Sequence, residues 1–169
     1  QQCDGRRMFE TLACDLVGGG LSGDGVTRAN AVTFGVGANV FEYQAGSSVT
    51  GNVVGDGNDL FRLSGTNNGS FDVGQFGSTY QGFSSFAKIG TSVFTLTGTT
   101  TPLTPWTITA GTLAITSDAA LGDSSGALTF GGTAALRTDA DVAMARDIVL
   151  GGAPIFDISA GTTLTLAST

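Results

Sequence analysis

A run of short apolar segments separated by glycines occupies residues 92–161, and it limits the folds open to the chain more than any other feature. Each segment has only four to six residues, too few to be stable alone. Stacked on one another, such segments bury one continuous apolar column, as in solenoid proteins. In order, the segments are residues 93–98, 106–111, 112–115, 127–132, 135–138, 147–152 and 155–158.

From Val26 onward the sequence also alternates between strand-like and turn-like stretches. Apolar and polar residues alternate in several of them, which fits strands buried on one face. Gly, Asn, Asp and Ser fill the intervening turns, as tight connections require. The predicted strands here are residues 32–34, 40–43, 48–50, 52–54, 60–63 and 70–73.

Two all-β architectures fit this spacing, a β-sandwich and a right-handed parallel β-helix with about three short strands per coil. The 24 threonines and the reuse of one phrase, at 111–115 and again at 161–166, favour the β-helix. Stacked coils place like residues above one another, and Thr, Val, Ile and Phe tolerate that stacking. We therefore predict a β-helix (a solenoid) over residues 26–169, preceded at 1–25 by a short N-terminal cap or a disordered segment. Its core strands are expected at 93–97, 112–115, 127–130 and 148–150.

Composition excludes several classes of function. With 14 acidic and 7 basic residues, and Lys88 as the only lysine, the chain lacks the clustered cations that bind nucleic acid. No apolar run approaches the ~18–20 residues of a membrane helix, so no membrane insertion of this segment is expected. The absence of histidine excludes a Ser-His-Asp triad and, with only Cys3 and Cys14 as thiols, the usual zinc sites. In an exported protein these two cysteines either form a disulfide or stay free.

Acidic residues offer one candidate for catalysis. Asp139 and Asp141 lie two residues apart, so they would share one side of a strand, and Asp118 and Asp123 flank a turn. Carboxylate pairs in a groove serve β-helix enzymes that cleave polysaccharides. The alternative, which the sequence favours, is that these aspartates are solvated turn residues that cap backbone N–H groups. No catalytic residue and no cofactor is therefore predicted.

Residues 55–61 resemble one unit of a calcium-binding β-roll, in which Asp56 and Asp59 would supply oxygen ligands. Such a roll needs tandem copies, because each ion sits between successive turns, and only one copy is present. The favoured interpretation is a Gly/Asn/Asp turn between Val54 and Leu60, with no metal ligand.

An aromatic cluster stands out at residues 75–86. Its members are Phe76, Tyr80, Phe83 and Phe86. An exposed row of such rings would bind glycans, whereas a buried row would fill the core. The second interpretation is favoured in a chain with two methionines and one tryptophan.

Four segments, taken in order, are similar to phrases of the passenger-associated transport repeat of bacterial autotransporter passenger domains. Residues 88–98 (KIGTSVFTLTG) resemble the phrase KxGxGxWTLTG, and residues 106–113 resemble the phrase VxAGTL. Residues 120–130 resemble ALGxxxGxLTF, and 147–166 resemble a closing phrase that contains GTTLTL. The likeness covers about half of the chain, residues 80–168.

The sequence departs from this pattern at a few positions. Phe94 stands where the family often has Trp, Ala134 and Ala135 replace a glycine-rich phrase, and Pro154 interrupts a glycine run. These residues are all compatible with strands or turns.

The resemblance implies a non-catalytic structural segment of a secreted or surface-exposed passenger at the outer membrane of a Gram-negative bacterium. Such a segment supports folding during export and display, in the setting of virulence, and a C-terminal β-barrel translocator is expected in the full-length protein. One alternative is an adhesin that binds a host glycan or matrix protein through residues 75–86, and another is the polysaccharide-active enzyme. Because an uncovered end coil leaves free strand edges, self-association through the open end rungs is a side prediction.

Overall fold

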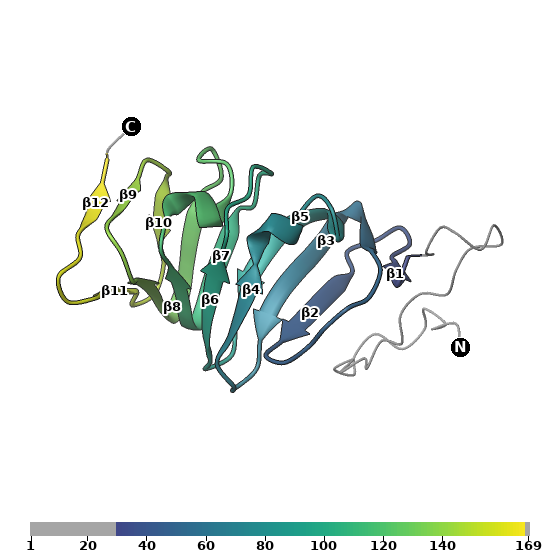
Figure 1. Ribbon diagram of the computed structural model, residues 1–169, viewed down its shortest axis with the longest axis horizontal. Helices are drawn as coiled ribbons and strands as arrows, with labels where there is room; N and C mark the ends of the chain where they lie inside the picture. The colour runs from purple at the N-terminus through teal and green to yellow at the C-terminus, as the bar shows by residue number, and fades with distance from the viewer. Residues whose placement is uncertain (1–29, 168–169) are drawn as a thin grey trace.

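The computed structural model describes residues 30–167, which form a parallel β-helix of about six turns. Strands of successive turns lie side by side along the long axis, from the N-terminal to the C-terminal end (Figure 1). Every strand pairing within residues 30–167 is parallel, which confirms the predicted solenoid and excludes an antiparallel sandwich. The predicted cap at 1–25, with Cys3 and Cys14, lies outside the described residues.

Twelve strands and two short 3₁₀ turns make up the described residues. They are β1 (Val32–Thr33), β2 (Val40–Gln44), β3 (Val53–Ser64), β4 (Gly69–Asp72), η1 (Val73–Gln75), β5 (Tyr80–Lys88), β6 (Val93–Thr97), β7 (Trp106–Ile115), η2 (Asp118–Leu121), β8 (Leu128–Thr138), β9 (Val142–Met144), β10 (Ile148–Leu150), β11 (Ile155–Ile158) and β12 (Leu164–Leu166). Within this range no helix has both the length and the apolar character that crossing a membrane requires.

The coils stack in register, so each inward position continues from turn to turn as a column. One column runs Phe41, Phe61, Phe86, Trp106, Leu128 and Ile148. A second runs Tyr43, Leu63, Lys88, Ile108, Phe130 and Leu150. The members from the second turn to the fifth are almost fully buried. Burial of each apolar side chain among them contributes about 1.5–3 kcal/mol to the free energy of folding.

Glycines mark the corners where a strand bends into the next face of the solenoid. Gly90 has φ 69°, a left-handed conformation that residues with a Cβ rarely adopt. A Cβ at Gly90 would also lie 2.6 Å from the carbonyl oxygen of Gly65 in the preceding turn. The glycine punctuation of the sequence therefore reflects both the bend and the close approach of stacked backbones.

Several predicted strand pairs form single bent strands. The predicted strands at 52–54 and 60–63 are the two ends of β3, and β7 and β8 each join two predicted segments. The parallel ladder continues through these bends with local register shifts, so the chain turns a corner without leaving the sheet.

The prediction of a strand at 48–50 is wrong. β5 and β9 were not predicted as strands, and the bounds of β12 were not predicted. The N–H of Ser47 donates to the carbonyl of Gln44 in a turn, and the chain leaves the ladder there. The prediction of 148–150 as a core strand is only partly right, because Leu150 is 61% exposed at the last turn.

Candidate functional site

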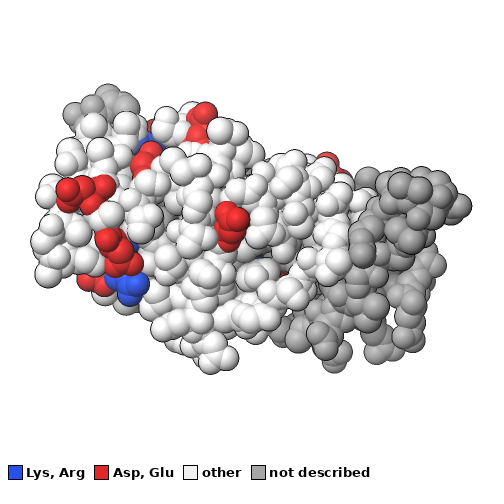
Figure 2. Space-filling model, viewed as in Figure 1, with Lys and Arg blue, Asp and Glu red and all other residues white. Residues whose placement is uncertain are grey.

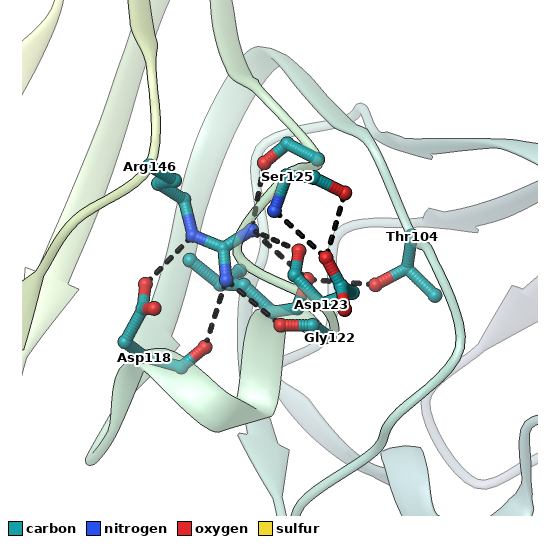
Figure 3. A network of polar contacts seen from close by, with 8 residues as sticks. Thr104, Asp118, Gly122, Asp123, Ser125 and Arg146 are labelled. Carbon is teal, nitrogen blue, oxygen red and sulfur yellow. Dashed lines mark hydrogen bonds and ion pairs between the residues drawn. The ribbon is translucent and has the colours of Figure 1, made fainter. Parts of the chain in front are cut away.

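The most densely bonded polar group in the stack is Arg146, between β9 and β10. Inward residues alternate along this segment, as Val142 and Met144 show, and Arg146 continues the alternation. Its side chain is therefore carried into the interior, where it is 1% exposed. Figure 3 shows the guanidinium surrounded by the loop of the preceding turn.

All the acceptors of Arg146 come from residues 118–126, and together these groups are called the Arg146 network. Nε donates to Asp118 Oδ1 at 2.6 Å, and Nη2 donates to the carbonyls of Asp118 (3.2 Å) and Gly122 (2.9 Å). Nη1 donates to the carbonyls of Gly126 at 2.8 Å, Leu121 at 3.2 Å and Asp123 at 3.4 Å. One side chain thus satisfies five backbone carbonyls and one carboxylate, which are costly to leave unbonded when buried.

Two further contacts fix the same loop. Thr104 Oγ1, from the turn before, donates to the Leu121 carbonyl at 2.7 Å. The backbone N–H and the hydroxyl of Ser125 both donate to Asp123 Oδ1, and these bonds hold the pKa of Asp123 below its usual value. Three successive turns are therefore joined at this point (Figure 3).

Lys88 is a second buried cation, in the column between Leu63 and Ile108. It is fully buried, and its Nζ donates to the carbonyls of Ile89 (2.6 Å), Gly90 (3.1 Å) and Ala110 (3.3 Å). Burial lowers the pKa of this amine to about 8, because the charged form loses its hydration. The ammonium is held by carbonyl dipoles alone in these contacts, without the carboxylate that Arg146 has.

Asp139 and Asp141 each bind partners of their own. Asp139 pairs with Arg137 at 3.0 Å and accepts a hydrogen bond from Ser159 Oγ at 2.8 Å. The Ser159 bond and, after it, Arg137 lower the pKa of Asp139, so this carboxyl is a poor proton donor. Asp141 Oδ1 accepts the backbone N–H of Thr163 at 2.7 Å. Asp141 thus caps a backbone N–H group, as the favoured interpretation predicts, whereas Asp139 binds two side chains.

Residues 55–59 form a bend within β3, and the carboxylates of Asp56 and Asp59 accept hydrogen bonds from backbone N–H groups. Asp59 is fully buried, and it accepts the N–H groups of Asn39 and Asp56, each at 2.8 Å. Asp56 accepts the N–H of Gly37 at 3.1 Å and that of Asn58 at 2.9 Å. Among residues 30–167, no group of three or more acidic, His or Cys side chains is placed to hold a metal ion. The predicted turn is therefore a bend inside the single strand β3, at the point where its register with β5 shifts.

The aromatic cluster fills the core of the N-terminal turns. Phe76, Tyr80 and Phe86 are 6%, 3% and 3% exposed, and Phe83 is half-buried. The ring of Phe61 lies 4.9 Å from that of Phe76 and 5.3 Å from that of Tyr80, between centroids. These rings therefore fill the core, as the favoured interpretation of the cluster predicts.

The visible surface of the rod carries few charges. In Figure 2 most of one face is uncharged, and acidic and basic side chains gather toward the C-terminal end.

No sequence motif pointed to Arg146 or Lys88 as buried groups. Their burial could have been inferred from the alternation of inward and outward residues along a strand. Lys88 lies two residues after the inward Phe86, and Arg146 lies two residues after the inward Met144.

Comparison with protein-family models, curated proteins and solved structures found no match to this chain. The arguments for function therefore come from the stack, its buried cations and the resemblance of its sequence phrases.

Proposed function

We propose that this chain is a non-catalytic structural segment of a secreted or surface-exposed autotransporter passenger, which supports folding during export and display at the cell surface. The parallel stack of turns over residues 30–167 is the observation that carries the proposal. A continuous solenoid matches the fold that the sequence resemblance implies. Its full-length form would carry a C-terminal β-barrel translocator.

The physical basis is that each turn offers the next one a strand edge and an apolar column. Folding of a solenoid can therefore propagate from turn to turn as a chain emerges from a pore. The Arg146 network adds a contact between turns, because loop 118–126 is completed by a side chain that lies about one turn later in the sequence. Such contacts resist unfolding of a rod that works outside the cell.

The test is to fuse the chain to an autotransporter β-barrel in a Gram-negative host and to measure surface display by protease accessibility on intact cells. We expect the wild-type passenger to reach the surface in folded, protease-resistant form. Leu128→Asp should lower the folded surface fraction at least severalfold, because Leu128 is 1% exposed in the core. The matched control is Thr129→Asp, the next residue on β8, which is half-buried and has the opposite parity.

A wild-type passenger retained inside the outer membrane would contradict the proposal. Equal display of the Leu128→Asp and Thr129→Asp variants would also contradict it, because export would then be independent of the core of the solenoid.

A further inference from the structure

Residues 65–68 connect β3 to β4 in the second turn, and they end on an asparagine that precedes a glycine. Of the asparagines in the chain, only Asn68 is followed by glycine. Such a pair can lose ammonia, because glycine has no Cβ to hinder the approach of its backbone nitrogen to the side-chain carbonyl carbon. The sequence therefore places one reactive pair well inside the stack.

Packing requires the glycine of this pair. A Cβ on Gly69 would lie 2.9 Å from Cβ of Ala45 in the preceding turn and 3.2 Å from the ring of Phe94 in the following turn. A larger residue at this position would therefore push stacked turns apart.

The asparagine is held from the following turn. Its Oδ1 accepts the backbone N–H of Val93, the first residue of β6, at 2.8 Å. Gly69 is the first residue of β4 and pairs with Phe94 in the ladder between β4 and β6. Asn68 is exposed to solvent, so what restrains it is this geometry and not burial. While β6 is in place, the carboxamide of Asn68 and the backbone of Gly69 are both fixed and cannot turn toward each other.

The reaction needs no reagent other than water. The backbone nitrogen of Gly69 attacks Cγ of Asn68 and gives up its proton, the bond from Cγ to Nδ2 breaks, and ammonia leaves with that proton. Water then opens the cyclic imide at one of its two carbonyls. Cleavage of the new bond at Cγ gives aspartate. Cleavage at the main-chain carbonyl gives isoaspartate, in which the backbone runs through Cγ and is one carbon longer.

We propose that Asn68 is a deamidation site that the stack protects, and that it reacts when β4 and β6 part. The two products then have different fates. An aspartate at position 68 still accepts the N–H of Val93. An isoaspartate lengthens the backbone next to Gly69, which is confined between Ala45 and Phe94. Deamidation to isoaspartate therefore marks chains that have stayed unfolded and prevents them from closing this turn.

The test compares the full chain folded in buffer with the chain unfolded in guanidinium chloride at the same mildly alkaline pH. Trypsin cuts after Arg62 and Lys88, so one peptide, residues 63–88, carries both Asn67 and Asn68. Fragmentation in a mass spectrometer assigns the deamidated residue, and Asn67 is the internal control. We expect Asn68 to react at least about tenfold faster in the unfolded chain, because the rate in buffer follows the population of the open form.

A pair of variants on β6 tests the protection in buffer, with the fold of each checked by circular dichroism. Phe94→Leu should raise the rate of deamidation, because Phe94 is fully buried against Gly69. Its matched control is Thr95→Ser, the next residue on the same strand, which has the opposite parity and should leave the rate unchanged.

Refolding tests the fate of the products. After removal of the denaturant, isoaspartate at position 68 should be depleted from the protease-resistant chains. Asn68→Asp carries the new charge on a normal backbone and should refold like the wild type. Equal rates in folded and unfolded chains, or no reaction at Asn68 in the denaturant, would overturn the proposal. Refolding of isoaspartate chains as complete as that of Asn68→Asp would overturn it as well.

Discussion

Arg146 and Lys88 are both buried in the stack, but their surroundings differ. Arg146 meets a carboxylate and five carbonyls of one loop, whereas Lys88 meets three carbonyls. A planar guanidinium offers five N–H groups in a fixed fork, so it can satisfy many acceptors at once. An ammonium offers three, and its strong hydration makes burial expensive. From this difference we expect a buried cation to stabilise this stack only where its donors complete a loop.

The largest expected effect comes from a buried charge with no surrounding acceptors. Leu128→Asp places a carboxylate in the Phe41–Ile148 column beside Trp106. Because such a charge is neither paired nor hydrogen-bonded, it should cost at least about 5 kcal/mol, comparable with the whole stability of a domain. Circular dichroism and urea unfolding should show an unfolded or aggregated chain. A soluble, folded Leu128→Asp variant would contradict the assignment of that residue to the core.

The next largest effect should come from Arg146. Arg146→Leu removes the guanidinium donors from the Asp118 carboxylate and from five carbonyls, of which that of Leu121 keeps the Thr104 hydroxyl and that of Asp123 keeps the N–H of Gly126. The substitution should lower the free energy of unfolding by about 3–5 kcal/mol. Hydrogen exchange should show lost protection in residues 118–126. Arg146→Lys is the matched variant: it keeps the charge but not the fork, and it should lose about 1.5–3 kcal/mol, as for one or more charged hydrogen bonds. Equal stability of the wild type and the Leu variant would mean that the network is not a stabilising contact.

An exposed ion pair provides a reference for the stability losses expected at Leu128 and Arg146. Arg137 and Asp139 are each about a third exposed, so the pair should contribute little. The double variant Asp139→Ala and Asp141→Ala should lose about 1 kcal/mol, mostly from the cap on Thr163 N–H, in urea unfolding. The same variant tests the enzyme alternative. Loss of a polysaccharide-cleaving activity present in the wild type would favour catalysis over the structural role.

The solenoid could be predicted because the sequence features that specify it are local and repeat along the chain. Short apolar segments, glycine corners and reused phrases all persist in the observed columns, of which Phe41–Ile148 is one. The bends of β7 and β8 were not predicted, because a glycine that ends a strand and one that bends it look alike in sequence. Asp118 and Asp123 were read as turn residues, but their partner Arg146 lies in a later turn. Which residues meet between turns depends on the number of residues in each coil. This number varies from 20 to 25 along one column, so such contacts could not be predicted from the sequence.

The smallest effect at neutral pH should come from Lys88, and its pH dependence decides the comparison. Lys88→Met replaces a buried ammonium with an apolar side chain of similar length, so at pH 7 the free energy of unfolding should change by no more than about 1 kcal/mol. In the wild type, burial lowers the pKa of Lys88 from 10.5 to about 8. Between these values the unfolded chain binds more protons than the folded chain, so stability rises with pH.

Urea unfolding of the wild type from pH 7.5 to 9.5 should therefore show increasing stability, and Lys88→Met should remove that increase. Tyr43 and Tyr80 act in the opposite direction, because burial raises the pKa of both in the folded chain, that of Tyr80 to about 12. Their effect begins mainly above this range, since an unfolded tyrosine ionises at about pH 10. A flat wild-type profile, or a loss at pH 7 as large as that of Arg146→Leu, would show that three carbonyls hold an ammonium as well as a closed loop holds a guanidinium. The two buried cations would then be equivalent, and the distinction drawn between them would be wrong.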